Sequence, residues 1–275
     1  MSLSLTGPEI KFLSWAQNRK RFVVRSGDAQ TSLKISKQQE AKIYSSLTQR
    51  GVIAQIKRGL YLVPPTIPPG GKWAPSAFLI LDVAMSDIEA SQYQITGMSA
   101  FNLYGLTEQI PNRIDVYNDK IWGEKNLAGQ EFRFIKTDRS RLGYTRNVKT
   151  DDQGVLGGRE VQAPYSNLPR AIFDAVYDYE RFGTLPNAYQ WIRVRLGEKE
   201  KMAEFVEICL KLGNVSTLRR IGFFLDQVNF SSVVVARFKR KLKKTTSYIP
   251  LDPTRPNRGK TYRDWGIIDN ESIPA

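Results

Sequence analysis

The chain has 275 residues, of which 41 are Lys or Arg and 27 are Asp or Glu, so its formal net charge is +14 at neutral pH. It has no histidine and one cysteine, Cys209, which excludes catalytic triads with an imidazole base, the usual Cys/His zinc sites and an internal disulfide. The sequence has neither a membrane-spanning apolar run nor a signal peptide, so we expect a cytoplasmic protein with no membrane partner.

The basic charge is concentrated near the two ends of the chain. Residues 1–70 contain 11 Lys or Arg and three Asp or Glu, a net charge of +8. Residues 237–263 contain ten Lys or Arg and one acid, Asp252. An excess of this kind favours nucleic acid, anionic lipid or an acidic protein as a partner, although many basic proteins owe their charge only to solubility.

The first 50 residues contain two helix-start signals. Thr6 and Glu9 form a capping box, and helical spacing follows. A second capping box, Ser36 with Gln39, opens a helix that we expect to end at Gly51. Its inner face carries Ile43, Tyr44 and Leu47. The piece between the two helices, about residues 29–34, is ambiguous.

A short hairpin is predicted directly after the second helix. Two apolar runs, Val52–Ile56 and Leu60–Val63, flank the turn Lys57-Arg58-Gly59, where glycine suits a positive φ. Helices followed at once by a hairpin with a basic turn indicate a winged helix-turn-helix, which we place at residues 1–64.

This arrangement suits double-stranded DNA, because a helix fits the major groove and a basic turn meets phosphates or the minor groove. The predicted DNA-binding residues are Ser36, Lys37, Gln38, Gln39, Lys42, Ser45 and Gln49 on the helix and Lys57 and Arg58 in the turn. The alternatives are a protein-docking module and a small helical domain whose polar face is merely solvated.

Residues 65–72 belong to a stretch rich in proline and glycine, which predicts a linker. Residues 73–275 then form a larger domain of the α+β class, because short strands come first and a run of helices follows. We expect a helix at 96–105, strands at 113–117, 131–136, 144–149 and 159–163, and a helix capped by Ser166. Further helices are predicted at 187–196, 199–212, 216–228 and 231–243, with an extended tail from Ser247.

Few residues suggest catalysis, and we expect no cofactor and no metal. Asp115 followed by Glu131 approaches the order of a metal-dependent nuclease, but Arg133 stands where such a site needs lysine. The acids Asp174, Asp178 and Glu180 are more typical of a solvated or ion-paired helix face. The glycines at 154–158 indicate a turn rather than a dinucleotide loop.

A basic amphipathic helix is predicted near residue 240. Its cations are Arg237, Lys239, Arg240, Lys241, Lys243 and Lys244. Such a helix packs its apolar residues in a core with a solvated basic face, or it contacts nucleic acid, protein or lipid.

Several segments together resemble AbiEi-type antitoxins. Gln49–Pro64 resembles the helix-end and wing signature of this family, while Tyr93–Ala100 and Tyr104–Pro111 look like the start of its second domain. Leu168–Ala175 and Leu218–Leu225 are similar to its later helices. Tyr104 stands where the family often has histidine. The resemblance covers roughly residues 36–230.

The resemblance implies an antitoxin of a bacterial abortive-infection (phage-defence) operon. Its winged helix would bind inverted repeats in operator DNA and repress its own operon, and its C-terminal domain would counter a nucleotidyltransferase toxin without a tight complex. The basic helix at 237–244 becomes a candidate for antitoxic action. Two alternatives are a repressor of another operon with a sensing C-terminal domain and a metal-dependent nuclease.

Overall fold

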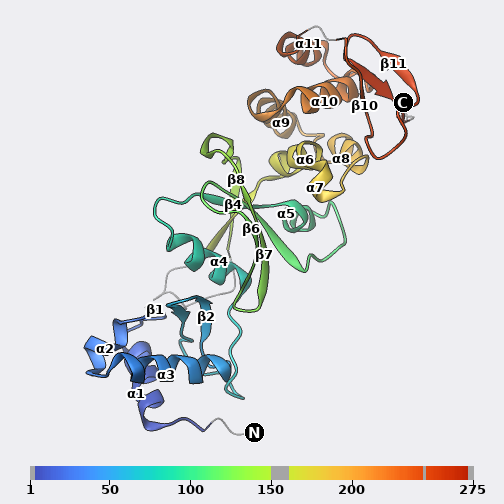
Figure 1. Cartoon of the computed structure of the whole chain (residues 1–275). Coiled ribbons are helices and arrows are strands. Elements are labelled where there is room, and N and C mark those ends of the chain that lie inside the picture. The colour runs from blue at the N-terminus through green and yellow to red at the C-terminus, as the bar shows by residue number, and fades with distance from the viewer. Residues whose placement is uncertain (1–3, 150–160, 244–245, 272–275) are drawn as a thin grey trace. The chain divides into compact units, whose positions relative to one another are not determined.

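A computed structural model describes residues 4–149, 161–243 and 246–271 and has a mixed α+β fold (Figure 1). Lys244, the turn predicted at 154–158 and the first residues of the strand predicted at 159–163 lie outside these ranges. Contacts divide the chain into two compact units. The first consists of Met1–Gln94, Val116–Leu142 and Asn147–Tyr165, and the second of Ile95–Asp115, Gly143–Arg146 and Ser166–Ala275. The division into residues 1–64, 65–72 and 73–275 stays a prediction.

The N-terminal elements surround a compact apolar core. In chain order they are α1 (Gly7–Asn18), β1 (Val23–Arg25), α2 (Asp28–Leu33), α3 (Lys37–Gln49), β2 (Ala54–Lys57) and β3 (Leu60–Leu62). The strands form an antiparallel sheet with the order β1-β3-β2. Phe12, Tyr44 and Leu47 are buried in one cluster with Val24 and Val63. The predicted hairpin is confirmed, and Gly59 in its turn has the expected positive φ of 80°.

A six-stranded sheet follows, with the strand order β6-β7-β5-β4-β9-β8. Its strands are β4 (Tyr93–Thr96), β5 (Arg113–Asn118), β6 (Gly123–Leu127), β7 (Gln130–Lys136), β8 (Thr145–Lys149) and β9 (Gln162–Ser166). The other elements here are α4 (Ala77–Ser86), α5 (Gly97–Leu103) and the 3₁₀ turn η1 (Arg139–Arg141). Helix α5 and strands β5, β7 and β8 correspond to predicted segments, whereas α4, β4 and β6 were not predicted.

The remaining helices are α6 (Leu168–Tyr177), α7 (Tyr179–Phe182), α8 (Asn187–Arg195), α9 (Lys199–Leu212), α10 (Val215–Gln227) and α11 (Ser232–Lys241). The four helices predicted between 187 and 243 are confirmed to within a few residues. The cap predicted for α6 was wrong by one residue. Asn167 accepts the hydrogen bond from the Arg170 N–H at 3.0 Å, because the Ser166 hydroxyl instead contacts Asp174 at 3.2 Å.

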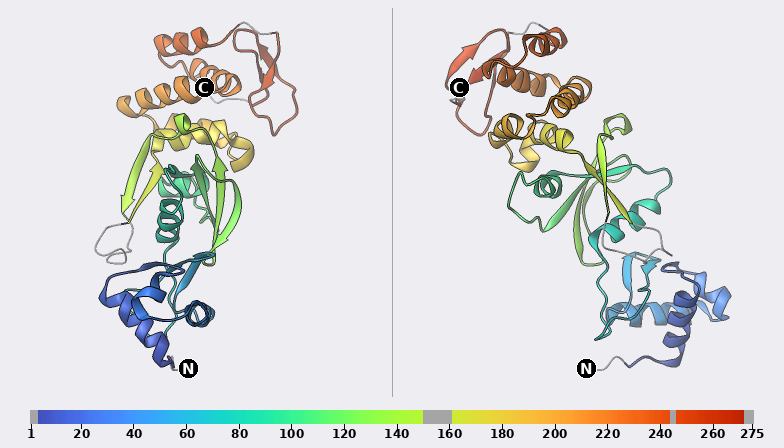
Figure 2. Two further views of the ribbon diagram at one scale, coloured as in Figure 1. Left: turned by 60° about the vertical axis from the view of Figure 1, so that its left-hand side comes forward. Right: turned by 180° about the vertical axis from the view of Figure 1, so that it is seen from behind.

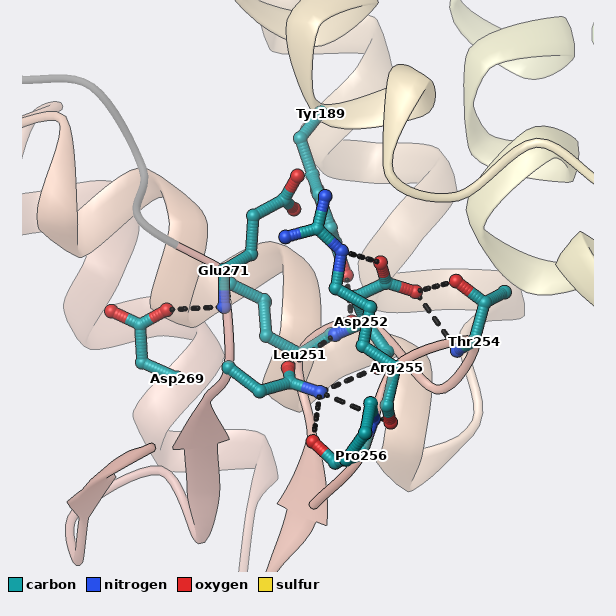
Figure 3. Close-up of polar contacts among 9 residues, drawn as sticks. Tyr189, Leu251, Asp252, Thr254, Arg255, Pro256, Asp269 and Glu271 are labelled. Atoms are coloured by element: carbon teal, nitrogen blue, oxygen red, sulfur yellow. Dashed lines mark hydrogen bonds and ion pairs between the residues drawn. The ribbon is translucent and has the colours of Figure 1, made fainter. Parts of the chain in front are cut away.

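The tail after Ser247 is not simply extended. It folds into a small sheet, drawn in red in Figure 2, of β10 (Ile249–Pro250), β11 (Lys260–Tyr262) and β12 (Ile267–Asp269). The strand order of this sheet is β10-β12-β11. Asn270 holds this segment: its side chain accepts from the Asp252 N–H and donates to the carbonyls of Asp252 and Pro256. Asp252 and Pro256 are labelled in Figure 3. Tyr189 of α8 donates to the Leu251 carbonyl at 2.8 Å, so the tail is tied to the helices.

Within the described ranges no helix is both long and apolar enough to cross a membrane.

Candidate nucleic-acid interface

Helix α3 presents most of the predicted DNA-binding residues on one exposed side. Ile43, Tyr44 and Leu47 are buried, and the side chains of Lys37, Gln38, Lys42, Ser45 and Gln49 are exposed. Ser36 and Gln39 are exposed too, but their side chains bond to the backbone. The Ser36 hydroxyl accepts from the Gln39 N–H at 3.2 Å, and the Gln39 amide oxygen accepts from the Ser36 N–H at 2.8 Å. These two side chains therefore hold the first turn of α3, as the capping box predicted.

A groove of about 390 Å³ lies beside the exposed side of α3. Three predicted residues, Lys37, Ser45 and Gln49, line it. Gln30 from α2 and Gln55 from β2 line it too and were not among the predicted residues. The alternation of buried and exposed residues along β2 places Gln55 outward, which is the signal that could have identified it. Amide side chains on a groove of this kind offer both donors and acceptors to base edges.

The buried carboxylate of Glu40 fixes α2 against α3. It accepts hydrogen bonds from the N–H groups of Gly27 and Ala29 at the start of α2, and from the side chains of Gln30 and Tyr44. An acid at a helix N-terminus is favourable because it satisfies N–H groups that lack partners within the helix. Burial, and then the charge of Glu40, raise the pKa of Tyr44 far above its usual value, so this hydroxyl stays a donor.

A second buried acid, Glu9, fixes α1 against the end of α3. Its carboxylate accepts from the Thr6 N–H at 2.8 Å, from the Ser46 hydroxyl at 2.7 Å and from Arg50 at 2.5 Å. Burial opposes ionisation, but these hydrogen bonds outweigh it and lower the pKa of Glu9 to about 2. Ser46 and Arg50 are thereby occupied with structure.

The two cations of the hairpin turn differ in their surroundings. The Lys57 ammonium lies 2.5 Å from Asp87, which follows α4, and Arg25 lies 2.6 Å from the same carboxylate. The hydrogen bond from Lys57 lowers the pKa of Asp87 against the opposing effect of burial, and Arg25 adds to the lowering. Arg58 is exposed at the turn itself. Arg58 lies on the turn as predicted, but Lys57 is the last residue of β2 and pairs with Leu60, so the predicted turn was one residue too long. The acid that partly neutralises Lys57 was not predicted.

The basic helix is α11, and its cations have different environments. Lys239 lies 3.6 Å from Asp226 and 3.9 Å from Asp264, and its ammonium sits over the Trp265 ring. Arg240 donates to the Ala236 carbonyl one turn back. Arg237, Lys241 and Lys243 are exposed. Lys239 is therefore exposed but paired with acids, unlike Arg237, Lys241 and Lys243, for which no ion pair is recorded within the described residues.

The acids weighed as catalytic candidates have structural surroundings. Asp115 is buried and lies 3.6 Å from Arg113, and Glu131 accepts a hydrogen bond from Asn126. Asp174 lies 2.7 Å from Arg170 inside the second unit, where burial raises its pKa despite the arginine. The described part of the chain holds no cluster of three or more His, Cys, Asp or Glu suited to a metal ion.

Comparisons with known proteins extend to the fold alone. No family model and no curated protein matches the sequence. Among solved structures, the crystal structure of the RV2827C protein from Mycobacterium tuberculosis is similar, with a TM-score of 0.57 and 13% sequence identity. The similarity covers 98% of this chain and 93% of that protein. The chain therefore shares its overall architecture with that protein.

Proposed function

We propose that residues 4–63 form a winged helix that binds double-stranded operator DNA, with α3 in the major groove. The observation that carries this proposal is the exposed polar side of α3 next to a basic hairpin turn. The element order α1-β1-α2-α3-β2-β3 supports it, since a helix pair followed by a hairpin is how such domains present one helix. The buried carboxylates of Glu9 and Glu40 support it too, because they hold α1 and α2 rigidly around α3.

The proposed roles follow from side-chain chemistry. Gln38 and Gln49 read adenine edges through their amides, and Lys37 and Lys42 reach guanine or phosphate. Arg58 contacts the DNA backbone or the minor groove. Lys57 contacts a phosphate as well, after its ion pair with Asp87 is replaced by one with that phosphate.

A titration of the full chain with duplex DNA at several salt concentrations tests this assignment. The duplexes are the region upstream of its own gene and a random sequence of equal length. Replacing Arg58 with alanine removes one phosphate contact, so the slope of log K against log salt becomes shallower by about 1 on both duplexes. Gln49→Ala instead lowers the preference for the upstream duplex. Arg146→Ala, at an exposed arginine of the second unit outside the two basic stretches, is the matched control. An unchanged slope in Arg58→Ala argues against the hairpin as a DNA contact.

We further propose that the chain is the antitoxin and autorepressor of a bacterial abortive-infection operon. It acts in the cytoplasm without catalysis or a cofactor, and residues 73–275 neutralise a nucleotidyltransferase toxin. The support is the set of AbiEi-like segments in the right order along the chain. Co-expression of the full chain with the product of the adjacent gene tests it. Lys42→Ala combined with Arg58→Ala should abolish repression and keep growth rescue, since the two activities reside in different parts. Failure of the wild-type chain to restore growth contradicts the antitoxin proposal and leaves the DNA proposal standing.

A second candidate is a repressor of another operon whose C-terminal part senses a ligand. A cavity among α8–α11 favours it. Release of bound DNA by a small molecule, together with no effect on any neighbouring toxin, distinguishes it from the first.

A further inference from the structure

The second unit contains a cavity of about 730 Å³ bounded by α8, α9, α10 and α11. Pockets for small molecules span roughly 300–1,000 Å³. Its walls are mainly apolar and include Leu196, Met202, Val206, Phe224 and Leu225. These five side chains are at most 9% exposed, so they form the floor of the hollow. Val228, Phe230 and Val234 also line it and are partly exposed, so they offer apolar surface that a ligand can cover.

The charge at this cavity has one sign. Arg193, Lys199 and Arg237 belong to its lining, from α8, α9 and α11. Within the described residues the lining contains no Asp or Glu. Cations beside an apolar hollow complement a molecule with an apolar body and an anionic group, because the body is desolvated while the charge stays near a counter-ion.

We propose that this cavity is a binding site for a small anionic amphiphile of the fatty-acid class. The apolar tail lies against Val228, Phe230 and Val234, and the carboxylate is held by Lys199 and Arg237. The site is separate from the groove along α3 and does not depend on DNA binding. It also gives Arg237 of the basic helix a role other than contact with nucleic acid.

Calorimetric titration of the full chain with hexanoate, octanoate and decanoate, all below micelle formation, tests the proposal. We expect saturable one-to-one binding whose affinity rises about fourfold with each added methylene group. Decanol, which has the same tail without the charge, should bind at least about fivefold more weakly. No saturable binding of any member of the series would overturn the proposal, as would equal affinity for decanol and decanoate.

Substitutions locate the site. Ala203 lines the cavity and is exposed, so Ala203→Trp fills the space without inserting bulk into the buried core. Ala236→Trp is the matched control, since Ala236 is exposed on α11 outside the lining. Loss of decanoate binding in the first variant and its retention in the second support the site. Equal effects of the two substitutions would overturn it.

The charge is tested in the same way. Arg237→Gln and Lys199→Gln should each weaken decanoate by about fivefold and leave decanol unchanged. Lys241→Gln, an exposed cation of α11 outside the lining, should change neither. A competing occupant is an acidic amphipathic peptide. Saturable binding of such a peptide, blocked by Ala203→Trp, with no binding of any fatty acid would overturn the proposal.

Discussion

Replacing Gly222 with alanine should destabilise the second unit, although alanine is the better helix former. Gly222 lies inside α10, where a Cβ atom would overlap the Trp265 ring and come within 3.1 Å of the Phe238 Cβ. Real Cβ atoms essentially never approach other heavy atoms this closely, so the neighbours must move. The absence of a side chain at Gly222 thus lets α11 and the Trp265 segment pack on α10.

The expected change in the free energy of unfolding is the sum of one favourable and two unfavourable contributions. Alanine instead of glycine in a helix interior is favourable by about 1 kcal/mol. Trp265 is only 2% exposed, and a buried aromatic covers about 150–250 Å², which is worth about 4–6 kcal/mol. Displacing the ring forfeits roughly half of that, together with its hydrogen bond to Asp226, worth about 1 kcal/mol. The net loss is about 2 to 3 kcal/mol.

Urea unfolding of four chains measures this effect: the wild type, Gly222→Ala, Trp265→Ala and the double variant. In the Trp265→Ala background the new methyl group has room, so Gly222→Ala should become neutral or stabilising. Hydrogen exchange should show lost protection in residues 246–271. The control Gly197→Ala places its Cβ in open space and should change stability by less than about 0.5 kcal/mol. Equal destabilisation by Gly222→Ala with and without Trp265 would refute the reasoning.

Two further changes test the N-terminal elements. The folded pKa of Glu9, about 2, lies below its ordinary value of 4.5, so its stabilisation is complete above pH 4.5 and is lost as the pH falls toward 2. Glu9→Gln should remove up to about 3 kcal/mol at pH 7 and flatten this acid dependence in urea titrations, and an unchanged pH profile would contradict the assignment. Asp87→Asn releases Lys57 and Arg25 from their shared acid, so DNA affinity by fluorescence anisotropy should rise about fivefold. Unchanged or weaker binding would show that neither cation reaches DNA.

The features that the sequence predicted well are those whose signals are local. The capping box at Ser36 lies within four residues, and the glycine of the hairpin turn needs no distant partner. The run of helices after residue 187 has clear apolar periodicity. Such patterns are determined by neighbouring residues and survive in most tertiary contexts.

The features that could not be predicted from the sequence depend on distant residues or lack a periodic signal. Helix α4 is apolar on nearly all sides, so periodicity could not separate it from a buried strand. Asp87 pairs with Lys57 only because the chain returns to β2, and the strand order β6-β7-β5-β4-β9-β8 is likewise a tertiary property. The packing of Trp265 on Gly222 could not be predicted, since a lone glycine in a helix pattern indicates lower helix stability rather than a close contact.

The net charge overstates the basic surface that is ready to meet an anion. Arg50 is committed to Glu9, Arg25 and Lys57 share Asp87, and Lys239 faces Asp226. An ion-paired cation contributes to DNA binding only after its acid is displaced, and that exchange offsets much of the gain from phosphate. The proposed contact with DNA would therefore depend on the few exposed cations of α3 and the hairpin turn. The C-terminal cations differ in the same way. Lys239 is paired with Asp226, while Arg237 lies at a cavity whose apolar walls do not suit nucleic acid.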